Sequence, residues 1–184
     1  KETKGATVRR YDLIMKEMSN HKGDFSPWDF IRYSRSYNSV KYGDVLALKS
    51  KYYCSNHTVP RYSTVGSFVM VCDAKNPRML VMNGHSVSSL AVPVYVKAER
   101  EIPQCVRGDA MRLLSNDFRE KAYSKDKNSK LALNKDVISA VLAVKHPKIE
   151  MPGEMPKDIR AFNAKIDKAF AKHEKRVRKV LSKF

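Results

Sequence analysis

The chain has 184 residues, of which 42% are hydrophobic, a length and composition typical of one globular domain rather than a disordered protein. Its 36 lysine and arginine residues against 19 acidic residues give a formal net charge of +17 at pH 7. Such a field attracts phosphates, anionic surfaces and acidic partners whatever the fold. No run approaches the roughly 18 apolar residues of a membrane span, and residues 1–10 lack the apolar centre of a signal peptide. The sequence predicts a soluble chain.

The three cysteines, Cys54, Cys72 and Cys105, have no C-x-x-C spacing, and their odd number leaves at least one thiol unpaired within the chain. This pattern predicts neither a disulfide framework nor a cysteine-rich zinc site. We expect no metal and no cofactor.

Two helices are expected at the start of the chain. Residues 6–19 space their apolar side chains as one amphipathic helix does. The next helix has a strong start signal, with Ser26 as N-cap, Pro27 at the first helical position and acidic Asp29 in the first turn. It should run to about Tyr37.

The second helix carries a polar cluster. Arg32, Arg35 and Asn38 lie at positions i, i+3 and i+6, so they should share one flank. Such a flank can hold a carboxylate or stabilise an oxyanion. A solvated helix face explains the same spacing equally well.

From residue 40 the pattern changes to that of strands, with short apolar runs rich in Val, Phe and Thr separated by turn residues. The runs cover residues 45–48, 63–71, 79–82 and 90–96. Pro93 lies inside the last run and predicts an edge strand or a bulge, because proline cannot donate to a neighbouring strand. We expect an antiparallel sheet in the middle of the chain.

Helices return after Pro103, and the polar residues 124–130 are expected to be a surface loop. Residues 136–144 form a further helix candidate. Residues 157–184 then combine an apolar face with a basic one, so we divide the chain into an α+β domain over 1–156 and a basic amphipathic C-terminal helix over 157–184. The lysine and arginine residues of the basic face include Lys165, Lys168, Lys172, Lys175, Arg176, Arg178 and Lys179.

Cys54 and His57 lie three residues apart ahead of the second apolar run. A thiolate beside an imidazole would be an activated nucleophile. Catalytic cysteine and histidine residues are usually distant in sequence, however, so a packed cysteine and a hydrogen-bonding histidine in a turn is the stronger interpretation. Together with His85 these two residues match no zinc pattern.

Three segments in order carry a resemblance to a known family. They are C-S-N-H at residues 54–57, S-T-V-G-S-F-V-M-V at 63–71, and D-A-K-N-P-R-M-L-V-M-N-G-H-S-V-S-S-L-A-V-P-V-Y-V at 73–96. Together they resemble the downstream half of the cysteine N-terminal nucleophile hydrolases. This family includes linear-amide hydrolases and autoproteolytic acyltransferases related to choloylglycine hydrolase and acyl-coenzyme A:isopenicillin acyltransferase.

The resemblance covers roughly residues 6–120 and extends loosely to the end of the chain. It implies a four-layer αββα sandwich, in which this chain supplies part of one sheet and helices on its outer face. The implied reaction is amide hydrolysis or acyl transfer on a small substrate. An N-terminal cysteine freed by self-cleavage attacks the amide carbonyl, its own α-amine accepts the proton, and water or another acceptor releases the acyl group. Family habit implies a secreted or periplasmic location, whereas the residues themselves also allow the cytoplasm.

The chain departs from the family in beginning with Lys1, so we expect the nucleophile on an upstream segment of the same precursor. The residues expected to line the site are Cys54, His57, Arg32, Arg35, Asn38 and Asn83. The alternative hypothesis is a basic module that binds nucleic acid or another polyanion through Lys172, Lys175, Arg176, Arg178 and Lys179. A structural family member without catalysis is a third interpretation, and each leaves a homo-oligomer open.

Overall fold

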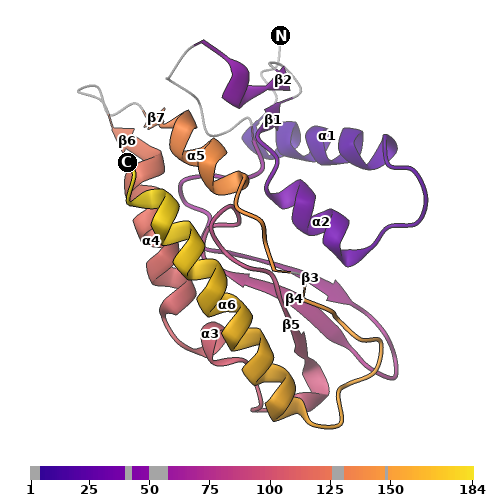
Figure 1. Ribbon diagram of the computed structural model, residues 1–184. Coiled ribbons are helices and arrows are strands. Elements are labelled where there is room, and N and C mark those ends of the chain that lie inside the picture. The colour runs from indigo at the N-terminus through magenta and orange to yellow at the C-terminus, as the bar shows by residue number, and fades with distance from the viewer. Residues whose placement is uncertain (1–4, 40–42, 50–57, 126–130, 148) are drawn as a thin grey trace.

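In the computed structural model of the chain, helices and small antiparallel sheets build an α+β fold, which confirms the expected fold class (Figure 1). The structure describes residues 5–39, 43–49, 58–125, 131–147 and 149–184. Within these ranges, every helix is too short or too polar to cross a bilayer.

The two expected N-terminal helices are α1 (Ala6–Ser19) and α2 (Pro27–Ser34). The start signal of α2 is confirmed, because the Asp29 carboxylate accepts hydrogen bonds from the Ser26 backbone N–H at 2.9 Å and from its hydroxyl at 2.7 Å. The carboxylate thus provides an acceptor for the Ser26 N–H, one of the backbone donors that have no acceptor within the helix at its N-terminus.

Helix α2 ends at Ser34 rather than near Tyr37, because the chain turns into the short strand β1 (Asn38–Ser39). Strand β1 pairs antiparallel with β2 (Gly43–Asp44), so Asn38 belongs to a strand and not to the helix.

The central sheet has the order β3-β4-β5 and is antiparallel throughout, as expected. Its strands are β3 (Gly66–Val71), β4 (Arg78–Asn83) and β5 (Val92–Tyr95). Strand β5 lies at the edge of the sheet, so the edge position predicted from Pro93 is confirmed.

Two local expectations were wrong. Residues 45–48 do not form a strand, because the Asp44 carboxylate accepts the N–H of Leu46 and starts a short 3₁₀ helix at Val45–Ala47. The expected loop over 124–130 begins instead as strand β6 (Tyr123–Lys125), which pairs with β7 (Leu131–Leu133). Residues 126–130 lie outside the described residues.

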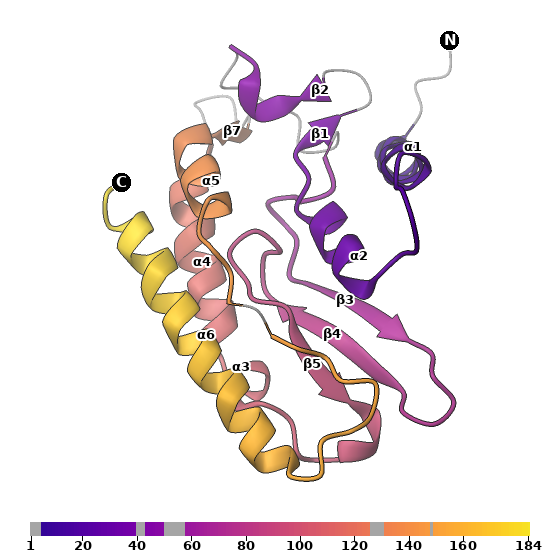
Figure 2. The same ribbon diagram turned by 45° about the vertical axis from the view of Figure 1, so that its right-hand side comes forward.

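The remaining helices pack side by side and enclose the main core with the end of the central sheet (Figures 1 and 2). They are α3 (Gln104–Arg107), α4 (Ala110–Ala122), α5 (Lys135–Leu142) and α6 (Ile159–Leu181). The apolar face predicted for α6 is confirmed, since it contributes buried side chains to this core: Ile166, Phe170, Val177 and Leu181.

One face of the central sheet is covered by α2 and by the segment that precedes α6 (Figure 2). Ile31 of α2 packs with Leu80 and Met82 of β4, and Met151 joins them. The Tyr95 hydroxyl also donates a hydrogen bond to the carbonyl of Pro152 at 2.7 Å. The Ile31 contacts place α2 against the sheet, and the contacts of Met151 and Pro152 place the segment that precedes α6 there.

Candidate functional site

The loop that joins β4 to β5 (residues 84–91, the β4–β5 loop) is buried throughout. At the end of α2, Arg35 donates from Nε to the Ser86 carbonyl at 2.8 Å and from Nη2 to the Ser89 carbonyl at 2.9 Å. Burial lowers the pKa of Arg35 to about 10, so the guanidinium stays protonated at neutral pH. Within the described ranges, no acidic side chain forms an ion pair with it.

The same loop is held from α6 by a histidine. His173 Nε2 lies 2.9 Å from the carbonyl of Ser88, to which it donates. The ring of His173 stacks on that of His146, with centroids 4.7 Å apart. Burial and the nearby Arg35 cation lower the pKa of His146 to about 3, so this histidine is neutral at physiological pH.

Arg32, Arg35 and Asn38, which were expected to share a helix flank, do line one pocket of about 530 Å³. The spacing argument was wrong for Asn38, since this residue reaches the pocket from β1. Arg32 forms an ion pair with Asp29 at 3.1 Å, and the Asn38 side chain donates to Glu17 at 3.0 Å. Arg35 differs from these two residues in that its described partners are uncharged: the Ser86 and Ser89 carbonyls and the Met82 sulfur, which lies 3.7 Å from Nη2.

A second pocket, of about 430 Å³, adjoins the first and shares Trp28, Arg35 and His146 with it. Most of its remaining lining is apolar and comes from the loop end and the segment after α5: Leu90, Ala91, Pro147 and Ile149. The buried guanidinium thus lies beside two hollows on the covered side of the sheet.

Asn83, the remaining described candidate, lies at the end of β4 and is separated from this trio by the sheet. In the register of the sheet, Asn83 is opposite Gly66, and Val81 is opposite Phe68. Because Asn83 is two positions from Val81 along β4, the side chains of Asn83, Val81 and Phe68 lie on the same face, opposite the face that α2 covers. Its side-chain amide donates to the Val106 carbonyl at 3.5 Å, a long hydrogen bond. The structure therefore divides the expected site between the two faces.

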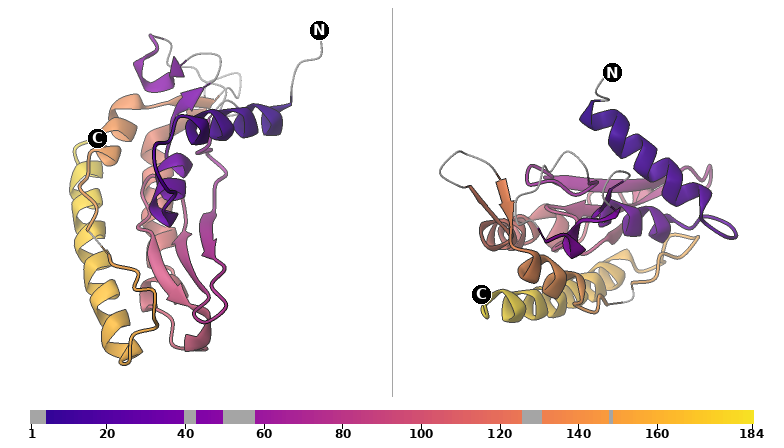
Figure 3. Two further views of the ribbon diagram at one scale, coloured as in Figure 1. Left: turned by 90° about the vertical axis from the view of Figure 1, so that its right-hand side faces the viewer. Right: turned by 90° about the horizontal axis from the view of Figure 1, so that it is seen from above.

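The face that bears Asn83 is apolar and bare along β3, whereas at β5 the side chain of Val92, opposite Val81, is fully buried in the main core. Phe68 and Met70 of β3 are 67% and 57% exposed, although both lie in the middle of a strand. Their cross-strand neighbours Val81 and Met79 are only partly buried. The sheet borders open space on this side, while α2 and α6 lie on the other (Figure 3, left).

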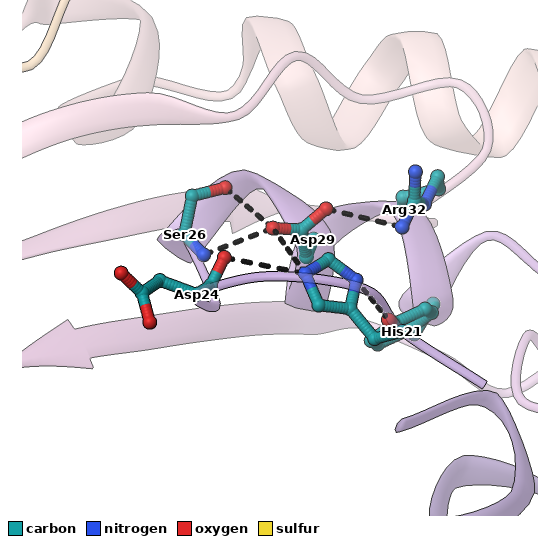
Figure 4. Close-up of polar contacts among 6 residues, drawn as sticks. His21, Asp24, Ser26, Asp29 and Arg32 are labelled. Carbon is teal, nitrogen blue, oxygen red and sulfur yellow. Dashed lines mark hydrogen bonds and ion pairs between the residues drawn. The ribbon is translucent and has the colours of Figure 1, made fainter. Parts of the chain in front are cut away.

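Serine, histidine and aspartate side chains also lie close together at the N-terminus of α2 (Figure 4). The Ser26 hydroxyl donates to Asp29 and not to His21, and His21 Nε2 is 4.0 Å from Asp29 Oδ2 and 3.2 Å from the Asp24 carbonyl. A nucleophilic triad requires the histidine to accept the serine proton. This group therefore caps α2 and lacks the geometry of a catalytic triad.

Sequence reasoning missed a buried polar network around His85. The Val87 N–H donates to His85 Nδ1 at 3.3 Å, so Nε2 carries the proton and donates to the Tyr123 hydroxyl at 3.0 Å. The Tyr123 and Tyr37 hydroxyls lie 2.7 Å apart. Burial lowers the pKa of His85 to about 3, in keeping with this neutral tautomer.

Tyr123 and Arg119 line a third pocket, of about 690 Å³, between α4, β6 and the segment before β3. Arg119 donates to the Thr64 carbonyl and to the Asn116 side chain. The contact between Arg119 and Thr64 joins residues 55 positions apart, so the sequence gives no local signal for it. The three pockets offer hydrogen-bonding groups, and the described residues contain no cluster of three His, Cys, Asp or Glu side chains that could hold a metal.

Cys54 and His57 lie outside the described residues. Of the basic residues expected to bind a polyanion, Lys172, Lys175 and Lys179 are exposed on α6. The two arginines are engaged: Arg178 pairs with Asp117 and Glu174, and Arg176 donates to the Lys145 carbonyl at 3.0 Å. Comparisons of the chain with models of protein families, with curated proteins and with solved structures found no match.

Proposed function

We propose that the chain is the non-nucleophile portion of an amide hydrolase or acyltransferase, whose N-terminal cysteine belongs to an upstream segment of the same precursor. The observation that carries this proposal is the bare apolar face that β3 and the neighbouring residues of β4 present on one side of the sheet. In an antiparallel sheet with one solvated face, polar residues alternate with apolar ones. Strand β3 instead places Phe68 and Met70 on the outer face and Val69 on the inner one, a pattern that favours a cover on both sides.

A second sheet would satisfy this face. Sheets pack face to face at about 10 Å, so that their apolar side chains interdigitate. With α2 and α6 behind the first sheet, a second sheet in front with its own helices would complete the four-layer αββα sandwich. Helix α1 extends beyond the sheet on this same side (Figure 3, left) and exposes Val8, Tyr11 and Met15 at helical spacing, which offers a further apolar wall.

Asn83 is the candidate that this arrangement leaves facing the space between the sheets. Its amide nitrogen has two hydrogens, and the long bond to the Val106 carbonyl uses one of them. In the proposed reaction the cysteine sulfur bonds to the amide carbon, and the carbonyl oxygen becomes an oxyanion that Asn83 would stabilise. Loss of the amine then gives the thioester, which water or an acceptor amine cleaves. Arg32, Arg35 and Asn38 lie behind the sheet and would not touch the acyl group.

The decisive experiment uses the gene product that includes the segment preceding Lys1. Intact mass and N-terminal sequencing of every polypeptide are expected to reveal a partner that begins with cysteine, and a panel of small amides should then be hydrolysed. Cell fractionation checks the secreted or periplasmic location that belongs to the proposal. A product without any N-terminal cysteine, inactive on all amides, would contradict it.

A matched pair of substitutions tests the bare face itself. Phe68→Asp places a charge in the proposed contact between the sheets, whereas Phe184→Asp places one at the end of the chain on a side chain that is also exposed, at 50%. We expect Phe68→Asp to abolish co-purification of the two portions and Phe184→Asp to preserve it. Equal co-purification of both variants would show that the face is not the contact.

A further inference from the structure

Five lysines form a single exposed stripe along α6 (the lysine stripe). They are Lys165, Lys168, Lys172, Lys175 and Lys179. Their spacing alternates between three and four residues, so they follow one flank of the helix. With a rise of about 1.5 Å per residue, the stripe is about 21 Å long.

The acidic side chains of α6 do not neutralise the lysine stripe. Asp167 accepts hydrogen bonds from the backbone N–H groups of Gln104 and Cys105 and so caps α3. Glu174 pairs with Arg178. In the part of the chain that the structure describes, no member of the stripe has an ion pair.

Each lysine of the stripe has another lysine three or four positions away, and like charges at these spacings repel and destabilise a helix. A local arrangement that opposes folding, and that the described residues do not compensate, is typical of a functional surface. An anionic partner would supply the missing compensation.

The surroundings of the stripe favour a phosphate backbone over a membrane. Binding to a lipid surface requires an apolar helix face that can insert, and the apolar face of α6 is already buried in the core. Stacking on single-stranded bases requires exposed aromatic rings, but Phe170 of α6 is buried and Phe162 packs edge-on against Tyr95 at 5.9 Å. We propose that the lysine stripe binds the backbone of double-stranded nucleic acid without reading its sequence.

This inference is independent of the proposed amide chemistry. Helix α6 lies on the side of the molecule opposite the bare face of the sheet (Figure 3, left). A second sheet packed on that face would leave the stripe open, and a failure of either proposal leaves the other unaffected.

The test compares two triple variants that lose the same charge. K168Q/K172Q/K175Q removes the centre of the stripe, and K16Q/K75Q/K97Q removes three exposed lysines on α1, the β3–β4 turn and the segment after β5. Binding of a fluorescein-labelled DNA duplex is measured by anisotropy between about 50 and 200 mM salt. We expect the stripe variant to reduce the slope of log K against log salt by about 0.9 for each lysine, and the control to leave it nearly unchanged.

K168R/K172R/K175R keeps the charge and should bind like the unmodified chain. Equal losses in the two glutamine variants would attribute binding to the overall charge and overturn the assignment. Absence of duplex binding, or tighter binding to vesicles containing phosphatidylserine or to a single strand, would equally contradict it. Circular dichroism of each variant establishes that the helix is intact, as expected for exposed side chains.

Discussion

Arg35 Nη2 lies 2.9 Å from the carbonyl oxygen of Ser89, a residue 54 positions later in the chain. With the second bond, from Nε to the Ser86 carbonyl, the guanidinium fork joins the end of α2 to the buried β4–β5 loop. Arg35 therefore adds to the packing of Ile31 on Leu80 and Met82 in holding α2 over the sheet, and it also lines two of the pockets.

Replacing Arg35 by leucine is expected to lower the free energy of unfolding by about 3 kcal/mol, because buried carbonyls lose charge-assisted hydrogen bonds. Lysine should not restore the loss, since an ammonium cannot reproduce the fork. Arg32→Leu is the matched control: its side chain is 66% exposed in an ion pair, so we expect a change of less than about 1 kcal/mol. Equal urea midpoints for the Arg35 and Arg32 variants would disprove this role of Arg35.

Gly84 is expected to tolerate no side chain. Its φ of +117° is unfavourable for other residues, and a Cβ would lie 2.8 Å from the Ser115 Cβ and 2.9 Å from the Ser89 hydroxyl oxygen. Gly23 has a φ of +87° but open space around it, so Gly23→Ala measures the backbone cost alone, about 1 kcal/mol. In thermal unfolding, Gly84→Ala should lose clearly more stability than Gly23→Ala. A similar loss in both would mean that α4 and the loop move apart easily.

The sequence was sufficient for features that depend on neighbouring residues. The capping of α2 by Ser26 and Asp29 and the edge position of Pro93 follow from local chemistry, and both are present. The β4–β5 loop could not be predicted as buried, because its serines are typical of a surface turn and its partners Arg35 and His173 are distant in sequence. Helical spacing predicted only that Arg32, Arg35 and Asn38 share a flank: Arg32 and Arg35 lie on α2 and line one pocket, whereas Asn38 reaches that pocket from a strand.

The bare sheet face shows a further limit of the sequence. Consecutive apolar residues from Phe68 to Val71 predict a strand that is buried on both faces. The pattern does not say which element packs against each face. In the described part of the chain, α2 and the segment before α6 pack against one face, and the side chains of Phe68 and Met70 on the other face are exposed. The apolar run predicts that both faces of β3 are buried, yet Phe68 and Met70 are exposed. We therefore expect a second sheet to pack against these side chains.

Acid should destabilise the fold through its buried histidines. His85 and His146 are neutral in the folded chain, where burial lowers each pKa to about 3, against about 6.5 in the unfolded chain. The unfolded state therefore binds more protons below about pH 6.5, so the stability present above that pH is lost as the pH falls toward 3. Urea unfolding between pH 7 and pH 4 should show a falling midpoint, and His146→Gln should reduce the slope. The same slope in the variant would exclude His146 from the effect.

The two described cysteines should differ sharply in reactivity. Cys105 is 6% exposed, and burial together with the adjacent Asp167 carboxylate raises the pKa of its thiol, so little thiolate forms at neutral or mildly alkaline pH. Cys72 is exposed. Brief treatment of the folded chain with iodoacetamide, followed by peptide mapping, should label Cys72 and leave Cys105 unmodified. In urea both should react, which controls for peptide recovery, and fast labelling of Cys105 in the folded chain would show that its pocket opens to solvent.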